Sequence, residues 1–330
     1  RGLKMNLGFP ILLCAAPMVG QSDIAFRILT RRWGASLAYS EMLFSERIVE
    51  EEDYLAEKLQ SCMEDRPLIV QICGNDPSIM ARAACLIEDF CNNKSHGVDA
   101  IDINLGCPQK RAAEGHYGSY LLEKKDWKLV QEIVESMSKS VNIPISCKIR
   151  LLQTESQTVE FAKLLEAAGC SLLAVHGRQR GSQRHGRKGP ADLDQIAAVK
   201  RALTIPVIAN GNVRSPEDIW INLEKTRADG IMSAEGLLAN PAIFKQALLL
   251  REGKDYQGNP LRQVALEYLD LAEEWKVPMD VQEQHVSHIL GLSSATGGAS
   301  WQHRKTAAER TKDLSLESKQ GEAEEEEEER

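Results

Sequence analysis

Eight short apolar segments alternate with amphipathic segments between residue 11 and about residue 236, and this alternation restricts the possible folds more than any other feature. The apolar segments are nearly continuous, which is typical of strands buried on both faces and therefore of a parallel sheet. They are 11–18, 35–42, 67–74, 100–107, 144–151, 171–178, 206–212 and 230–236. Eight strand-helix repeats predict a closed (β/α)8 barrel, the TIM barrel, rather than an open sheet.

The segments between the predicted strands have helical periodicity and helix end signals. Residues 77–91 place four apolar side chains on one face: Ile79, Ala83, Ile87 and Phe90. A helix over 158–169 ends at Gly169, and one over 215–227 opens with Ser215 followed by proline, as helix starts often do. No GxGxxG follows a predicted strand, which argues against a Rossmann domain.

The chain after the predicted barrel divides into a helical part and an acidic part. We expect a helix near 240–251, a polar linker over 252–259, and helices over 261–275 and 279–290. The first of the last two should pack on the barrel through Val264, Tyr268, Leu271 and Trp275, which recur at helical spacing. The predicted domains are a barrel over 1–251, a partial helical domain over 261–291 and a disordered acidic tail over 292–330.

The net charge of −8 says little about partners because most of it lies in one segment. Residues 317–330 contain eight Glu against Lys319 and Arg330, a net charge of −6, so the remainder is near −2. A near-neutral body can still carry a local basic patch. The segment 178–188 has five Arg or Lys in eleven residues, which favours contact with RNA phosphates, although a solvated charged loop has the same composition.

The eight cysteines show neither a CxxC pair nor a Cys/His cluster with zinc spacing. Most lie in apolar segments, which predicts reduced thiols, an intracellular protein and no metal site. No apolar run reaches the roughly 18 residues that a membrane-spanning helix needs. We therefore expect no membrane contact and a cytoplasmic location, with the nucleus as an additional one. We also expect a monomer.

Polar residues follow six consecutive predicted strands, where function in a TIM barrel is located. Core packing does not explain polar groups at so many strand ends. They are Gln71, Asn104, Cys107, Lys148, Arg150, His176, Arg178, Asn210, Gly211, Asn212, Glu235 and Gly236.

Six motifs at these strand ends resemble those of the dihydrouridine synthase family over about residues 11–250. In order they are APMVG (16–20), NLGCP (104–108), CKIR (147–150), VHGR (175–178), ANGN (209–212) and MSAEG (232–236). The segments RPLIVQICGNDP (66–77) and GHYGSYL (115–121) resemble the eukaryotic branch that acts on positions 16 and 17 of the tRNA D-loop. The resemblance implies tRNA as substrate, FMN as cofactor and NADPH as reductant.

The resemblance also implies roles for individual residues. Cys107 would be the general acid that gives a proton to the uracil ring, while the hydride comes from reduced FMN. Lys148 would pair with negative charge on the flavin, because a lysine in an apolar strand is costly without an anion. His176 would face the flavin or the uracil, and Gln71 suits the uracil-like edge of the flavin. Asn104 would reach the substrate base.

The phosphate end of FMN should lie beside the last two strands, where barrels commonly bind phosphate. The expected residues are Asn210, Gly211, Asn212, Ala234, Glu235 and Gly236. Pro17 and Met18 of the first motif are further expected cofactor contacts, and Arg178 would contact substrate or phosphate. Read without the resemblance, the glycines could simply form tight turns.

Two other functions fit the same sequence. One is a catalytically defective splice or truncation variant that binds flavin but holds tRNA weakly, since only two helices follow the barrel. The other is an FMN barrel that reduces a small molecule, which would need no basic loop. Dihydrouridine content of tRNA after incubation with NADPH separates both from the tRNA reductase.

Overall fold

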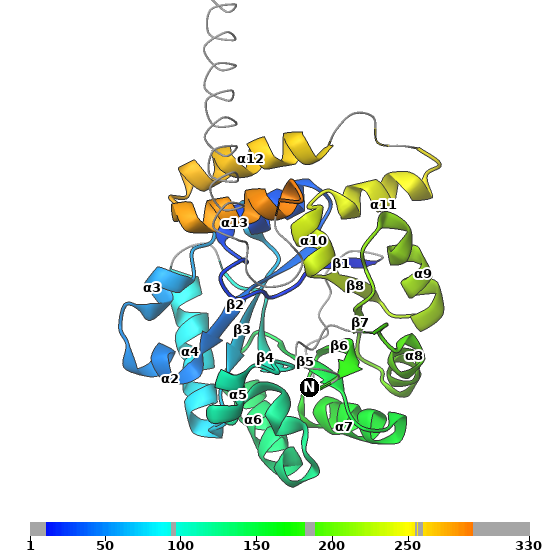
Figure 1. Cartoon of the computed structure of the whole chain (residues 1–330). Helices are drawn as coiled ribbons and strands as arrows, with labels where there is room; N and C mark the ends of the chain where they lie inside the picture. Colours follow the sequence, from blue (N-terminus) through cyan, green and yellow to red (C-terminus); the bar gives the residue numbers. More distant parts are fainter. Residues whose placement is uncertain (1–10, 94–96, 182–188, 255, 257–259, 293–330) are drawn as a thin grey trace, which may run out of the picture.

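The computed structural model describes residues 11–93, 97–181, 189–254, 256 and 260–292. Its centre is a closed barrel in which each strand pairs in parallel with the next and the last strand pairs with the first (Figure 1). The strands are β1 (Leu12–Ala15), β2 (Leu37–Phe44), β3 (Leu68–Cys73), β4 (Ala100–Leu105), β5 (Ile145–Leu151), β6 (Leu172–Gln179), β7 (Val207–Asn210) and β8 (Gly230–Ser233). The predicted TIM barrel is confirmed.

Several predicted strands were too long at their carboxyl ends. The predictions 11–18 and 230–236 extend three residues beyond β1 and β8, and the prediction 206–212 extends two residues beyond β7. Residues 211–212 have positive φ angles, +118° at Gly211 and +56° at Asn212, which strand backbone does not adopt. Apolar composition therefore predicted where β7 lies, but the positive φ angles of the two residues after it determine where the strand ends.

Helices surround the barrel, as Figure 1 shows. They are α1 (Ile24–Arg32), α2 (Ser45–Glu50), α3 (Tyr54–Lys58), α4 (Pro77–Asn93), α5 (Lys110–Glu114), α6 (Trp127–Ser140), α7 (Glu155–Ala168), α8 (Leu193–Ala202), α9 (Pro216–Thr226), α10 (Glu235–Ala239), α11 (Ile243–Arg251), α12 (Pro260–Glu274) and α13 (Met279–Ile289). Short 3-10 turns are η1 (Met63–Asp65), η2 (Gly118–Leu122) and η3 (Lys124–Asp126). The helix predicted near 240–251 is α11, and α10, which precedes it, was not predicted.

Local sequence explains where several helices start and stop. The side chain of Asp23 accepts a hydrogen bond from the Phe26 amide at the start of α1. Ser215 and Asp218 form a capping box at α9, with proline in the first turn. Gly169 ends α7 in the left-handed conformation that glycine adopts without strain.

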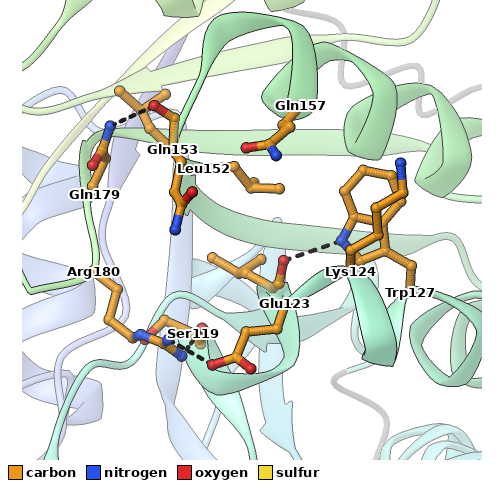
Figure 2. A pocket seen from close by; sticks show the side chains of 11 residues that line it. Ser119, Glu123, Lys124, Trp127, Leu152, Gln153, Gln157, Gln179 and Arg180 are labelled. Atoms are coloured by element: carbon orange, nitrogen blue, oxygen red, sulfur yellow. Dashed lines mark hydrogen bonds and ion pairs between the residues drawn. The ribbon is translucent and has the colours of Figure 1, made fainter.

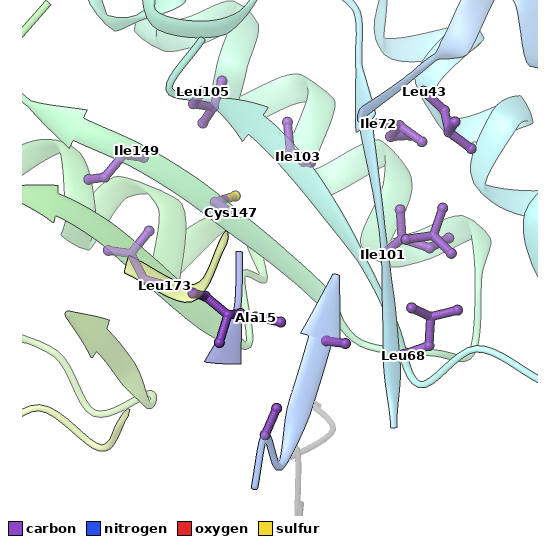
Figure 3. Close-up of a cluster of buried hydrophobic side chains, with 14 of the residues drawn as sticks. Ala15, Leu43, Leu68, Ile72, Ile101, Ile103, Leu105, Cys147, Ile149 and Leu173 are labelled. Atoms are coloured by element: carbon purple, nitrogen blue, oxygen red, sulfur yellow. The ribbon is translucent and has the colours of Figure 1, made fainter. Parts of the chain in front are cut away.

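The strands alternate their side chains between two cores. Those facing outward pack between sheet and helices, including Ile101, Ile103 and Leu105 of β4 (Figure 3). Those facing inward fill the barrel with residues such as Leu37, Tyr39, Ile69, Ala100, Leu172, Ile208 and Met232. Because β4 also directs Asp102 and Asn104 inward, its alternation brings polar groups into the barrel.

Helices α12 and α13 lie against the barrel beside α1 and α10 (Figure 1). Val264, Tyr268 and Leu271 of α12 are buried, as predicted, and Trp275 is partly buried. His285 of α13 is fully buried, with its Nε2 2.9 Å from Asp23 Oδ2 and its ring stacked on Phe26 at 4.4 Å between centroids. The two helices therefore continue the barrel's core. The predicted tail beyond residue 292 lies outside the described residues.

A buried ion pair ties α1 to the segment before β3. Arg27 donates from Nε and Nη2 to the carboxylate of Asp65 at 2.6–3.1 Å, and both side chains are almost completely buried. Arg27 also donates to the backbone oxygens of Ser22 and Gln60. The carboxylate faces a second cation, since Arg31 Nε lies 3.7 Å away.

Within the described ranges, no helix is both long and apolar enough to cross a membrane.

Candidate active site

The predicted polar residues meet at the carboxyl-terminal end of the barrel, here called the mouth. Strand register places Asn104 beside Lys148, and His176 beside both Arg150 and Asn210. Because neighbouring parallel strands end at the same edge, the side chains from β4 to β7 form a continuous row. The structure therefore brings together the residues that the sequence placed at separate strand ends.

A chain of hydrogen bonds runs from the barrel interior to the loop after β4. Gln71 Nε2 donates to Asp102 Oδ2 at 2.8 Å, and Gln71 Oε1 accepts from Asn104 Nδ2 at 2.8 Å. Asn104 Oδ1 in turn accepts the backbone N–H groups of Gly106 and Cys107 at 3.0 and 2.9 Å. We call this series from Asp102 to Cys107 the amide relay. The side chain of Asn104, predicted to reach a substrate base, is thus occupied in fixing the Cys107 loop; contact with a base stays a prediction.

Asp102 is a site residue that our sequence reasoning did not single out. It is fully buried, accepts a hydrogen bond from Ser146 Oγ at 2.7 Å, and burial raises its carboxyl pKa to about 6. A carboxylate acceptor also fixes the direction of the Gln71 amide, because only its NH2 group can face an anion. The sequence feature that could have identified Asp102 is its position as an acidic residue in an otherwise mainly apolar strand.

Cys107 lies half-buried just beyond β4, where the turn η2 holds its backbone. Its carbonyl accepts hydrogen bonds from the amide and the hydroxyl of Ser119 at 3.0 and 2.9 Å. Gly118 makes this close approach possible, because its φ is +65° and a Cβ there would lie 2.8 Å from the Cys107 oxygen. Burial raises the pKa of the Cys107 thiol, so the group stays neutral at physiological pH and can donate a proton.

Lys148 and His176 lie in the same row, but near neutral pH Lys148 is mainly charged and His176 is neutral. Lys148 Nζ donates to Asn210 Oδ1 at 3.2 Å, and burial together with the nearby Arg150 lowers its pKa to about 8. Burial and the cations of Lys148, Arg150 and Arg178 lower the pKa of His176 to about 2. Its ring is therefore neutral and its Nε2, 3.0 Å from Arg178 Nη1, accepts from that guanidinium.

At the ends of β7 and β8 the backbone is tightly packed, and one buried polar atom lacks a hydrogen-bond partner among the described residues. A Cβ at Gly211 would lie 2.8 Å from Ala191, and one at Gly236 would lie 2.3 Å from the Val213 oxygen, so both positions need glycine. Ser233 Oγ, at the end of β8, is buried without a hydrogen-bond partner among the described residues. This environment fits a bound polar group such as a phosphate.

Three details correct or extend the predictions for this end of the mouth. Ala234 precedes α10, while Glu235 and Gly236 belong to the first turn of that helix rather than to a strand. Asn212 accepts a hydrogen bond from Arg178 Nη2 at 3.1 Å, so these two predicted residues hold one another. Pro17 and Met18 lie in the turn after β1, where the Met18 amide donates to Ser22 Oγ at 2.9 Å.

Only the start of the predicted basic loop is described, since 182–188 lie outside the described residues. Arg180 donates to the Ser119 oxygen at 2.9 Å and to Glu123 Oε1 at 2.8 Å, and its guanidinium stacks over the ring of Tyr120. These contacts tie the end of β6 to η2, which holds Cys107. Arg180 therefore helps to build the mouth.

A pocket of about 400 Å3 opens beside the mouth, between η2, α7 and the end of β6 (Figure 2). Leu122, Leu151 and Leu152 contribute its apolar wall, while Gln153, Gln157 and Gln179 contribute side-chain amides. None of the residues predicted for cofactor, proton transfer or substrate lines this pocket. Among the residues with described positions, no cluster of three or more His, Cys, Asp or Glu could hold a metal ion.

Comparison with known proteins gives one consistent result. The family model for dihydrouridine synthase matches residues 14–330. The chain is 42% identical to a mouse (Mus musculus) tRNA-dihydrouridine(16/17) synthase [NAD(P)(+)]-like protein over 273 residues, which are 82% of this chain and 53% of the mouse protein. It is 37% identical to tRNA-dihydrouridine synthase B of Shewanella oneidensis over 278 residues, which are 80% of this chain and 82% of the bacterial protein.

The chain spans little more than half the length of the 16/17 synthases that it matches, 53–58% in four eukaryotes. Among solved structures, 6-hydroxypseudooxynicotine amine oxidase of Pseudomonas geniculata superposes with a TM-score of 0.53 at 12% identity, over 78% of this chain and 50% of that one. At this identity the likeness concerns the barrel fold alone.

Proposed function

We propose that this chain, which belongs to the dihydrouridine synthase family, reduces uridine to 5,6-dihydrouridine in the D-loop of tRNA, using FMN and NADPH. The observation that carries the proposal is the neutral thiol of Cys107, fixed at the mouth by the amide relay and by η2. The D-loop target is supported by the names of four eukaryotic relatives at 40–43% identity, which specify positions 16 and 17.

The proposed reaction adds a hydride to one carbon of the uracil C5–C6 double bond and a proton to the other. A bound reduced flavin would supply the hydride. Cys107 would supply the proton from its Sγ, and the resulting thiolate would recover a proton from solvent. Lys148 and Arg150 lower the energy of that thiolate, since both cations oppose the effect of burial on its pKa. The neutral His176 ring could offer a hydrogen bond to the base without adding charge.

The residues at the mouth fit FMN. The ammonium of Lys148, held inside the barrel, suits the electron-rich isoalloxazine ring. Gln71 of β3, whose amide bonds Asp102 and Asn104 in the amide relay, would lie next to the same ring. Asn210, Gly211 and Asn212 with Ala234, Glu235 and Gly236 would hold the phosphate end, where the orphaned Ser233 hydroxyl lies. Arg178 would reach the phosphate or the RNA, and Pro17 and Met18 would cover the flavin from β1.

The purified protein should be yellow and should release FMN, not FAD, on denaturation. The two glycine-containing turns at 211 and 236 suit a single phosphate, and no GxGxxG follows a strand to hold an adenine dinucleotide. Chromatography of the released flavin identifies it. A folded but colourless protein that cannot be reconstituted with FMN would contradict the whole proposal.

Asp102→Asn should slow uridine reduction by roughly 5- to 150-fold, the equivalent of losing about 1–3 kcal/mol of buried hydrogen bonding. An asparagine that keeps its oxygen on Ser146 turns its NH2 toward Gln71. Gln71 must then rotate, which places its own NH2 against that of Asn104 and disrupts the amide relay. The effect should appear in kcat per bound FMN.

The pH profile separates this positioning role from simple structural damage. With a pKa of about 6, Asp102 takes up a proton as the pH falls below that value, so wild-type turnover should decline there. Asp102→Asn should be slow at every pH but lack this acidic decline. A variant that keeps the decline, or that turns over normally, would show that Asp102 does not act through the relay.

A flavin-binding chain that holds tRNA weakly is the second candidate, because α12 and α13 are the only helices after α11 among the described residues. The measurement that separates the two is dihydrouridine formed in unmodified tRNA per bound FMN. A small-molecule reductase would oxidise NADPH with a soluble acceptor and leave the tRNA unchanged.

A further inference from the structure

The pocket beside the mouth shares a wall with the candidate active site (Figure 2). Ser119 lines the pocket and also holds the Cys107 carbonyl through two hydrogen bonds. Arg180 lines it as well, in an ion pair with Glu123 that closes one side. A group bound in this pocket would therefore contact the residue whose amide and hydroxyl bind the carbonyl of the proposed proton donor.

The chemistry of the walls selects a flat, hydrogen-bonding ligand. Gln153 and Gln157 direct amides into the space, and an amide can donate and accept hydrogen bonds at once, as the edge of a nucleobase requires (Figure 2). Leucine side chains form the apolar floor, and Trp127 is held in the wall by donating from Nε1 to the Leu122 oxygen at 3.1 Å. The volume of about 400 Å3 is at the lower end of the roughly 300–1,000 Å3 of small-molecule sites.

Three cations and two carboxylates surround the pocket, and the excess of one positive charge suits a ligand attached to phosphate. Lys124 lies at the rim with its Nζ 5.0 Å from the Trp127 ring centroid and 3.3 Å from Glu160 Oε1, and Lys125 pairs with Glu123 at 3.0 Å. Arg180 adds a third cation on the opposite side. Nucleobases that leave a stack in RNA loops are bound in this way, by hydrogen bonds at their edges beside phosphate-contacting cations.

We propose that this pocket binds one nucleobase, contributed by a nucleotide near the uridine that is reduced. The proposal rests on the proposed function, and it makes Gln153 and Gln157 specificity-determining residues that help to select which uridine reaches Cys107. The same amides and apolar floor would also accept the adenine of NADPH. The experiments below therefore test tRNA and NADPH separately as the source of the base.

Photocrosslinking tests the RNA source without requiring any reaction. Gln157→p-benzoyl-L-phenylalanine in the full chain should crosslink unmodified tRNA at one or two adjacent nucleotides of the D-loop. The matched control is the same replacement at Gln131 on α6, an amide outside the pocket that donates to Glu135. Crosslinks scattered along the tRNA, or no more frequent than at Gln131, would overturn the RNA assignment even if the protein proved inactive.

Steady-state kinetics distinguishes the two sources. The double variant Gln153→Ala, Gln157→Ala should raise the KM for tRNA by about 10- to 100-fold, as expected for two lost hydrogen bonds, with the KM for NADPH unchanged. A raised KM for NADPH alone would assign the pocket to adenine and overturn the RNA source. If both KM values and the crosslinking pattern match the control, the pocket binds no nucleobase.

Discussion

Cys107→Ala should lower the rate of uridine reduction by roughly 10²- to 10⁴-fold, the range for loss of a general acid. Flavin content and NADPH oxidation should be retained, because the variant removes only the proton donor. The thiol is suited to this role because burial keeps it neutral and because the amide relay and η2 fix its backbone from two sides. Dihydrouridine in tRNA, measured per bound FMN, gives the rate.

Two further variants make the result specific. Cys85→Ala changes a thiol on α4 that bonds the Ser140 oxygen far from the mouth, and it should leave the rate unchanged. Cys107→Ser keeps the shape but offers a much weaker acid, so it should be nearly as slow as alanine. If Cys107→Ala instead lost its flavin while turnover per remaining FMN stayed normal, Cys107 would be a structural residue.

Asp65→Ala should lower the free energy of unfolding by about 3–5 kcal/mol, because it leaves a buried charge without its partner. Arg27 would lose its hydrogen bonds to the carboxylate, and Arg31 would lose the same anion, with neither guanidinium able to reach water. Urea unfolding followed by circular dichroism measures the loss, and α1 should detach first.

The neighbouring Glu64 provides a matched control. It pairs with Arg32 at 2.7 Å, but both side chains are nearly half exposed, so Glu64→Ala should cost no more than about 1 kcal/mol. Equal losses in the two variants would mean that burial of the Arg27–Asp65 pair has no special effect on stability.

The sequence predicted the barrel because a buried parallel strand is an almost continuous apolar run, which can be recognised without knowing which strands it pairs with. It also located Gln71, Asn104, Lys148, His176 and Asn210, since polar residues at strand ends are conspicuous in an apolar pattern. Their roles as cofactor or substrate contacts stay predictions.

The residues that were missed depend on partners distant in sequence. Asp102 is one acidic residue inside a strand, and its importance comes from Gln71, 31 positions earlier, and Ser146, 44 positions later. Asp65 sits in a short irregular turn and gains its role from Arg27, 38 positions earlier. Sequence periodicity indicates which face of a helix or strand is buried. Hydrogen bonds and ion pairs between residues distant in sequence can be identified only once the folded structure is known.

The contact between α13 and α1 has a consequence for the order in which the protein is made. Phe26 and Asp23 leave the ribosome early, yet His285, which covers them, follows 262 residues later. At 5–20 residues per second, that separation corresponds to roughly 13–50 s of synthesis. Throughout this interval the first helix lacks its cover, so a nascent chain stalled before α12 would display Phe26 to chaperones and proteases.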